Sequence, residues 1–401
     1  MDRRFFSQSL AFAAGMFSYL RNGAANSDDQ EAAGQNASAA RSTSRAVTVE
    51  DFIPLAKAKL PKATFDYIST GSEDEVTLHN NVEAFRRMRL LPPLMHGVNK
   101  VNLETTVLGQ RIAMPIMLAP VAVQRMFHPQ GARAAARAAG KAGTVFVAST
   151  SAGNSVEEIA AAAKGPVWFQ LYVPRQREVA KRLVQRAERA GYQAILVTVD
   201  LGERKDADLR NGFRPPQDML LKHLRDVGHT QLTEQHSYEE LWNFNAKAWE
   251  LSLSWEFFEW LRGETQMPIL VKGVLSPEAA LKAVSLGLDG IVVSNHGGRK
   301  LDGMPASIDV LRDVAAAVDG RIEILLDSGV RRGSDVLKAL ALGAKAVLVG
   351  RPYAWALAAD GEAGVTRVLE ILRDELTNAM IASGCPTTDR INESVIMKNQ
   401  A

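Results

Sequence analysis

Short apolar runs recur along the chain and alternate with amphipathic or alanine-rich stretches. Runs rich in Val, Ile and Leu, bounded by Gly, Pro or polar residues, predict buried strands. The predicted strands are 115–119, 144–148, 167–172, 194–200, 268–272, 290–295, 323–327 and 346–350. The helical period predicts helices at 131–141, 155–163, 176–190, 277–286, 307–318 and 333–342.

This alternation predicts an α/β fold, a parallel (β/α)8 TIM barrel, because each crossover helix must cover the sheet to which the chain returns. We expect an N-terminal helical segment before the first strand and a long, lid-like insertion after the fourth. An open doubly wound sheet is the alternative. No dinucleotide-type glycine fingerprint follows the first strand, which favours the barrel.

Polar residues gather at the carboxyl ends of the predicted strands, which meet at one mouth of a barrel. We therefore expect one large site there. These residues are Thr150, Gln170, Tyr172, Thr198, Asp200, Lys272, His296, Arg299, Asp327, Arg331 and Arg351, and the apolar Pro120 stands at the same point after the first strand.

The loop after the sixth strand reads SNHGGRKLD and brings His296 and Arg299 to this mouth. A histidine can move a proton near neutral pH, and a guanidinium can bind a carboxylate through two parallel hydrogen bonds. Small residues and arginines after strands seven and eight occupy the usual phosphate position of this fold, with Arg331 or Arg351 as the anion's partner. Lys272 can stabilise negative charge on an electron-accepting ring.

Six motifs carry a resemblance to a known family. They stand in order as MLAPVA, FQLY, TVD, LVKG, SNHGGR and LDSGVRRG. From about residue 47 to 391 the chain resembles the FMN-dependent L-2-hydroxy acid oxidising enzymes, which include glycolate oxidase, L-lactate oxidase, L-lactate dehydrogenase and mandelate dehydrogenase. The resemblance implies oxidation of an L-2-hydroxy acid to the 2-oxo acid, with FMN as cofactor.

The resemblance also implies a role for individual residues. His296 is the expected base, and Asp200 is expected to orient it and raise its pKa. Arg299, Tyr67 and Tyr172 are expected to contact the substrate, although Tyr67 could instead cap the bottom of the barrel. The residues expected to bind FMN are Ala119, Pro120, Val121, Ala122, Ser149, Gln170, Thr198, Lys272, Ser294, Asp327, Gly329, Arg331, Gly350 and Arg351.

Three positions depart from the family pattern. The second substrate arginine falls in a segment with an additional residue, where Arg204 is the expected contact and Lys205 the alternative. Ser151 stands where glycolate oxidases tend to carry Trp, which leaves room for a longer substrate side chain. Lys300 replaces the common Gln after the loop arginine, a change that the sequence does not explain.

The insertion from 201 to 253 is long for a link between a strand and a helix, and we expect a mobile lid over the substrate. It contains His223, His229 and His236, whose spacings match no metal-ligand pattern, so these histidines are interpreted as surface residues and no metal site is predicted.

Residues 1–45 differ from the catalytic part, 46–401. Arg3 and Arg4 precede an apolar run at 9–20 that is too short to span a bilayer, and an Ala-, Ser- and Asn-rich stretch follows. This arrangement resembles a twin-arginine export signal and a disordered spacer, which predicts a periplasmic protein. A ragged terminus or a membrane-surface helix is the alternative, and it would leave the protein in the cytoplasm.

Composition narrows the choice of partners. The 47 basic and 45 acidic residues are intermixed along the 401-residue chain and give a net charge of +2, so no basic patch indicates nucleic-acid binding. One cysteine, Cys385, excludes an internal disulfide.

The expected partners are a small 2-hydroxy acid and an electron acceptor, which is oxygen, a quinone or a cytochrome. The resemblance implies a homo-tetramer.

Two other functions stay open at this point. An FMN-dependent isomerase barrel would not need His296 and Arg299 in one loop, which disfavours it. A cofactor-free barrel that binds an anion would use the same cations without redox chemistry. Whether the enzyme is an oxidase, a dehydrogenase or a monooxygenase is not decided by any residue of the sequence.

Overall fold

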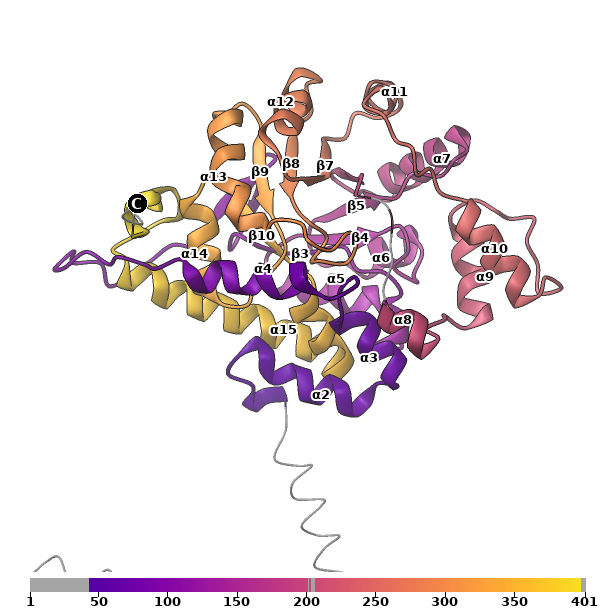
Figure 1. Ribbon diagram of the computed structural model, residues 1–401, viewed down its shortest axis with the longest axis horizontal. Coiled ribbons are helices and arrows are strands. Elements are labelled where there is room, and N and C mark those ends of the chain that lie inside the picture. Colours follow the sequence, from indigo (N-terminus) through magenta and orange to yellow (C-terminus); the bar gives the residue numbers. More distant parts are fainter. Residues whose placement is uncertain (1–42, 201, 203–205, 398–401) are drawn as a thin grey trace, which may run out of the picture. The chain divides into compact units, whose positions relative to one another are not determined.

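The computed structural model describes residues 43–200, 202 and 206–397, and the part from Thr43 onward forms one compact unit (Figure 1). Within these residues, parallel strands close into a barrel in the order β10-β3-β4-β5-β6-β7-β8-β9. Val347 of β10 lies opposite Ile116 of β3, which closes the ring and excludes the open sheet. The strands are β3 Ile116–Leu118, β4 Phe146–Ser149, β5 Val167–Leu171, β6 Ile195–Thr198, β7 Ile269–Val274, β8 Gly290–Val293, β9 Glu323–Leu326 and β10 Ala346–Val349.

The strands read as continuous apolar runs because both of their faces are buried. Alternate side chains point inward and fill the barrel, and the intervening ones pack under the helices. The inward-pointing set is Met117, Val147, Trp168, Leu196, Leu270, Val292, Leu325 and Leu348. The barrel is therefore a packed core, and a ligand site can form only at one of its ends.

The crossover helices surround this core (Figure 1). The six predicted helices are confirmed with ends that differ by at most one residue, whereas α11 and the long α15 were not predicted. Serine caps begin two of them: Ser155 and Glu158 form a capping box at α6, and the Ser276 side chain accepts from the N–H of Ala279 at α12. The helices are α5 Ala132–Lys141, α6 Val156–Ala162, α7 Arg177–Arg189, α11 Glu256–Glu264, α12 Pro277–Ser285, α13 Ser307–Val318, α14 Gly333–Ala341 and α15 Arg351–Ala382.

The N-terminal helical segment is present, and a hairpin follows it. Strands β1 Thr105–Val107 and β2 Gln110–Ile112 are antiparallel, and their Val107 and Ile112 join the inner barrel core. This hairpin closes the amino end of the barrel and leaves the carboxyl end as the open mouth. The preceding elements are η1 Thr43–Arg45, η2 Val49–Asp51, α2 Phe52–Lys59, α3 Lys62–Ser69 and α4 Val76–Arg87, and the remaining short turns are η3 Gln124–Met126, η4 Thr388–Arg390 and η5 Glu393–Val395.

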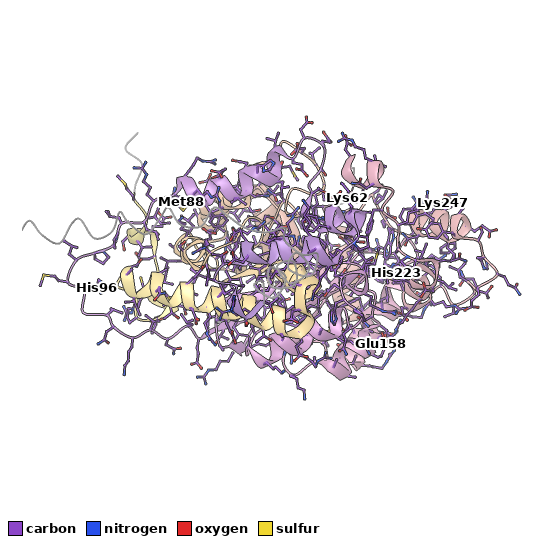
Figure 2. The ribbon with its side chains drawn as sticks, turned by 90° about the horizontal axis from the view of Figure 1, so that it is seen from below. Lys62, Met88, His96, Glu158, His223 and Lys247 are labelled. Atoms are coloured by element: carbon purple, nitrogen blue, oxygen red, sulfur yellow. The ribbon has the colours of Figure 1, made fainter. Side chains whose placement is uncertain are left out.

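The insertion after β6 forms α8 Asp206–Asn211, α9 Gln217–Asp226 and α10 Tyr238–Lys247. Figure 1 shows α9 and α10 to one side of the barrel, and Figure 2 labels His223 of α9 and Lys247 of α10. The two helices share a small core of Leu220, Leu221, Leu224, Leu232 and Leu241. None of the helices in the described part of the chain combines the length and hydropathy needed to span a bilayer.

Candidate functional site

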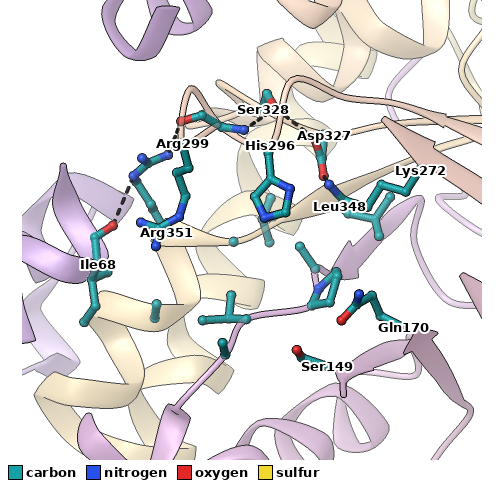
Figure 3. Close-up of a pocket in the computed structure, with 18 of the residues that line it drawn as sticks. Ile68, Ser149, Gln170, Lys272, His296, Arg299, Asp327, Ser328, Leu348 and Arg351 are labelled. Carbon is teal, nitrogen blue, oxygen red and sulfur yellow. Dashed lines mark hydrogen bonds and ion pairs between the residues drawn. The ribbon is translucent and has the colours of Figure 1, made fainter. Parts of the chain in front are cut away.

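A cavity of about 130 Å³, open to solvent, lies at the carboxyl end of the barrel. Figure 3 shows Arg299 and Arg351 at one end of it, Lys272 and Gln170 at the other, and His296 between them. Strands far apart in the sequence therefore contribute to one site, as the sequence predicted. The predicted residues that line it are Tyr67, Ala119, Pro120, Val121, Ala122, Ser149, Gln170, Tyr172, Thr198, Lys272, His296, Arg299, Asp327, Gly329, Arg331, Gly350 and Arg351.

His296 is held between a carboxylate and a phenol. Its Nδ1 lies 2.9 Å from Oδ1 of Asp200, and its Nε2 lies 3.3 Å from the hydroxyl of Tyr172. An ionised carboxylate can only accept, so Nδ1 carries the ring hydrogen and Nε2 presents its lone pair toward Tyr172. This arrangement prepares Nε2 to accept a proton.

The pKa of His296 lies below its ordinary value, although Asp200 raises it. Burial lowers it to about 4, and although the Asp200 carboxylate raises the pKa, Lys272 and Lys300 lower it further. The Asp200 carboxylate raises the pKa as the sequence predicted, but the cost of burying an imidazolium exceeds the attraction of one carboxylate. The ring is therefore neutral near pH 7, as a base must be.

Gly273 explains how Asp200 reaches this position. The register of β7 against β8 shifts between Lys272 and Val274, and Gly273 adopts a φ of +114°. A Cβ at Gly273 would lie 2.9 Å from Cβ of Asp200. Glycine is needed here because the backbone of β7 passes directly against the aspartate.

Lys272 is buried at the end of the cavity away from the arginines. Its ammonium lies 3.1 Å from Oδ2 of Asp327 and donates to Oγ of Ser294 at 2.8 Å. Burial disfavours the ammonium, but the carboxylates of Asp327 and Asp200 outweigh that cost and raise the pKa of Lys272. The lysine therefore keeps its positive charge beside the cavity.

Ser294 and Ser328 connect the loops around this lysine. Ser294 is fully buried and does not line the cavity; its Oγ also accepts from the backbone N–H of His296 at 3.0 Å. It therefore holds Lys272 and His296, and the predicted contact with the cofactor would pass through Lys272. Ser328, which the sequence placed only in the loop after strand seven, donates to Asp327 at 2.8 Å and accepts from the N–H of Gly297 at 2.9 Å.

Tyr67 lies at the mouth of the barrel and not at its bottom. Arg299 donates to the Tyr67 carbonyl at 2.6 Å, and its guanidinium carbon lies 4.8 Å from the centre of the tyrosine ring. On its other side the Tyr67 ring stacks on Phe213 of the insertion, with centroids 4.0 Å apart. Phe213 was missed because the sequence gives no sign of which distant ring it meets.

Arg351 and Arg331 form the cationic end of the cavity. The three hydrogen bonds of Arg351, of 2.8 to 3.1 Å, go to the carbonyl oxygens of Ile68, Thr70 and Gly297. Burial lowers the pKa of Arg351 well below its ordinary value, and repulsion from Arg299 and Arg331 lowers it further. Gathered positive charge of this kind favours a bound anion.

The groups present fit an FMN molecule. A phosphate suits the amino end of α15, which begins after Gly350, and the side chains of Arg331 and Arg351 beside it. The buried amide of Gln170, which donates to Thr198 at 3.0 Å, and the ammonium of Lys272 suit the polar edge of a flat ring. One small residue has another explanation: a Cβ at Gly329 would lie 2.1 Å from the Asn81 carbonyl oxygen, so this glycine is needed for packing against α4.

Two predicted substrate contacts, Arg204 and its alternative Lys205, lie outside the described residues. Asp200 does not line the cavity and acts from behind His296. Among the described residues, no cluster of metal-ligating side chains is found.

The histidines of the insertion have aromatic neighbours. His223 stacks on Trp249 with centroids 5.9 Å apart, and His229 is buried with its edge toward Phe244 at 4.7 Å. Their interpretation as surface histidines is wrong for His229, because the insertion has a core of its own. Trp249 in turn lies edge-on to Tyr172 at 6.2 Å, so the insertion contacts the site through this ring.

Comparison with known proteins agrees with the geometry. Residues 56–398 match the model of the FMN-dependent dehydrogenase family. Human 2-hydroxyacid oxidase 1 is 46% identical over 88% of this chain and 97% of its own length, and glycolate oxidase 3 of Arabidopsis thaliana is 47% identical over 87% and 95%. A crystal structure of mandelate oxidase with (S)-4-hydroxymandelic acid superposes with a TM-score of 0.80 at 41% identity, covering 88% of this chain and 98% of that one.

Proposed function

This chain belongs to the FMN-dependent dehydrogenase family, and from that premise we propose that it oxidises (S)-2-hydroxy acids, with lactate as the first candidate and longer aliphatic or aromatic acids close behind. The family, the cofactor FMN and the reaction class predicted from the sequence are confirmed. The observation that carries the proposal is the neutral Nε2 of His296, backed by Asp200, in the same cavity as Arg299.

The residues divide the work of binding and proton transfer. Arg299 binds the carboxylate of the substrate, and the Tyr172 hydroxyl, 3.3 Å from Nε2 of His296, holds the substrate hydroxyl against the base. The substrate loses two protons and two electrons to become the 2-oxo acid, and His296 accepts one of the protons. Asp200 stabilises the imidazolium that results.

FMN, when bound, supplies the two-electron acceptor that an external oxidant regenerates. Lys272, which keeps its positive charge at the cavity, would stabilise the negative charge that reduction brings to the cofactor. We propose oxygen as the external acceptor, with hydrogen peroxide as its product, because the relatives are named oxidases. A quinone or a cytochrome is the alternative, and stopped-flow reoxidation of the reduced enzyme by oxygen and by a quinone separates them.

The two functions left open by the sequence are less well supported. An isomerase has no need for a carboxylate-binding arginine next to a neutral base, and a barrel that only binds an anion has no need for a neutral histidine held by a carboxylate. Ala122 lines the cavity and supports substrates longer than glycolate, whereas Ser151, on the loop after β4, is not among the lining residues.

Replacing His296 tests the proposal directly. We expect His296→Ala to lower the rate of anaerobic flavin reduction by (S)-lactate about 10²- to 10⁴-fold, the usual contribution of a general base, while the purified protein stays yellow with FMN. His79→Ala is the matched control, because this histidine is exposed on α4. Near-normal reduction by His296→Ala would remove the histidine from the mechanism.

Localisation and assembly are further proposals. The twin-arginine-like pattern at Arg3 and Arg4 supports export of a folded, cofactor-loaded enzyme to the periplasm, with 1–45 as signal and spacer. Fractionation of cells that produce the full chain, compared with a chain that begins at 46, tests this. The family resemblance supports a homo-tetramer, which light scattering of the holoenzyme measures.

A further inference from the structure

The proposed base stands in a left-handed turn of the backbone. His296 has a φ of +58°, and Gly297 and Gly298 follow with φ values of +68° and +70°. Glycine adopts this region at little cost, whereas a residue with a side chain is strained there. A strained residue keeps its conformation only where the surrounding structure holds it. The groups that hold this turn therefore decide where Nε2 of His296 points.

Asn295 closes the turn. The N–H of Gly298 lies 3.2 Å from Oδ1 of Asn295 and 3.1 Å from its carbonyl oxygen, and the two bonds enclose His296 and Gly297. Nδ2 of Asn295 donates to the carbonyl of Pro305 at 2.9 Å. These partners fix which end of the side-chain amide is oxygen, because an N–H can only donate and a carbonyl can only accept. Asn295 is fully buried, and the proposed function gives it no role.

Asn81 of α4 pairs with this amide from the other side. Its Nδ2 donates to Oδ1 of Asn295 at 2.9 Å, and its Oδ1 accepts from Nδ2 of Asn295 at 2.7 Å. The side-chain amide of Asn295 therefore makes all four of its hydrogen bonds, two as donor and two as acceptor. Both residues of this asparagine pair, Asn81 and Asn295, are buried, so solvent does not compete for the bonds between them.

Helix α4 is itself held at both ends. Near its beginning, the N–H of Thr77 donates to the Asp302 carboxylate at 2.7 Å. Near its end, Lys338 of α14 donates to the Phe85 carbonyl at 2.7 Å. Asn81 lies between these two attachments and therefore reaches the loop after β8 from a fixed support.

The arginine assigned to the substrate carboxylate has other supports. Arg299 donates to the Tyr67 carbonyl at 2.6 Å, and the Gly298 carbonyl before it accepts from the N–H of Ser72 at 2.8 Å. Neither bond involves the asparagine pair. Loss of the pair is therefore expected to displace His296 more than Arg299.

We propose that Asn81 is a positioning residue of the oxidation reaction, which acts through Asn295 to hold the turn at 295–298 and to aim Nε2 of His296 at the substrate. This inference rests on the proposed function and extends it to the helical segment before the barrel. Asn81 does not line the cavity and takes no part in the bond changes. It sets the distance and direction over which His296 accepts its proton.

Asn81→Leu tests the inference, because leucine has nearly the shape of asparagine and makes no hydrogen bond. Anaerobic stopped-flow mixing of the holoenzyme with (S)-lactate, or with the 2-hydroxy acid that reduces the wild type fastest, gives the limiting rate of flavin reduction and the apparent Kd. We expect the limiting rate to fall roughly 10- to 100-fold, as for a small displacement of a catalytic group, and the apparent Kd to change less than about threefold.

NMR of the histidine-labelled holoenzyme gives a readout that does not depend on turnover. In the wild type, the His296 ring should show one tautomer with its hydrogen on Nδ1, which faces Asp200. In Asn81→Leu the same resonances should report a mixture of tautomers, because the ring is no longer held against the carboxylate.

Two further variants separate positioning from stability. Asn80→Leu is the matched control, because it removes a hydrogen bond to Arg87 from the neighbouring position of α4, and it should leave the limiting rate and the apparent Kd unchanged. Asn81→Ser removes the paired amide with a smaller side chain and should also lower the limiting rate. The midpoint of thermal unfolding, followed by flavin fluorescence, measures the stability of each holoenzyme.

Three outcomes overturn the inference. An Asn81→Leu variant that unfolds at a lower temperature but reduces its flavin at the wild-type rate would show that Asn81 serves stability alone. A raised apparent Kd with an unchanged limiting rate would assign the asparagine pair to substrate binding. Failure of both Asn81 variants to fold with FMN bound would make Asn81 a folding residue only. A wild-type holoenzyme whose flavin no 2-hydroxy acid reduces would instead contradict the proposed function itself.

Discussion

Two histidines of this protein, His296 and His223, share a lowered pKa but differ in the groups that surround them. Burial brings the pKa of His296, at the barrel mouth, and of His223, in the insertion, to about 4. His296 has the Asp200 carboxylate on one nitrogen and the Tyr172 hydroxyl near the other. His223 stacks on Trp249, and the nearby charges that affect its pKa, from His229 and Lys222, only lower it further.

The difference teaches how to recognise the base in this fold. A lowered pKa reports burial and is common to both rings, whereas the hydrogen bonds that fix one tautomer occur at His296. Asp200 and His296, the reacting groups, follow the closely packed strands β6 and β8. The insertion has a small core of its own, and its Phe213 and Trp249 contact the rings of Tyr67 and Tyr172. The barrel therefore carries the reacting groups, and the barrel and the insertion together form the shape of the site.

Removing the carboxylate behind His296 gives the largest expected effect. We expect Asp200→Asn to lower the rate of flavin reduction about 10²- to 10⁴-fold, because the amide no longer fixes the tautomer or stabilises the imidazolium. Anaerobic stopped-flow absorbance measures it. Asp313→Asn, on the exposed face of α13, is the control and should have no effect. If Asp200→Asn lowered the rate of flavin reduction less than about threefold, the carboxylate would not distinguish His296 from His223 as a base.

The titration of the two rings comes next. Because each pKa lies near 4 in the folded protein and near 6.5 in the unfolded chain, both rings stay neutral as the pH falls through 6.5, while the unfolded chain takes up protons. Proton uptake by the unfolded chain lowers the free energy of unfolding. The protein therefore keeps its full stability with respect to these two histidines above about pH 6.5 and loses stability as the pH falls toward 4. NMR of histidine-labelled holoenzyme, assigned with His296→Gln, measures the titrations. A pKa above 6.5 for His296 would mean that the Asp200 carboxylate outweighs burial.

The smallest effect is expected from the contact between the insertion and the site. Trp249→Ala should lower kcat/KM roughly 2- to 10-fold, as expected for an aromatic pair worth about 0.5–1.5 kcal/mol, because Tyr172 loses the ring that supports it. Trp249→Phe should restore much of the loss. Trp242→Ala is the control, since this ring stacks on Tyr238 within the insertion. Equal losses in both alanine variants would assign the effect to the stability of the insertion.

Sequence reasoning predicted the parts of the site that follow strands. The ends of β5, β6, β7 and β8 carry Gln170, Thr198, Lys272 and His296, and parallel strands in a barrel bring such ends to one mouth. It did not predict α15, the three-helix organisation of the insertion or the aromatic contacts of Tyr67 and Tyr172, because each of these depends on which distant surface a segment packs against.

The amino-acid sequence by itself determined the number and order of the barrel strands, the family and the identity of the reacting groups, since these follow from local hydrophobic periodicity and from motifs of neighbouring residues. The tertiary structure alone decided that Ser294 is behind Lys272, that the carbonyl groups of Ile68, Thr70 and Gly297 hold Arg351, and that His296 is neutral. Burial and distance set these properties, and both arise only when segments far apart in the chain come into contact.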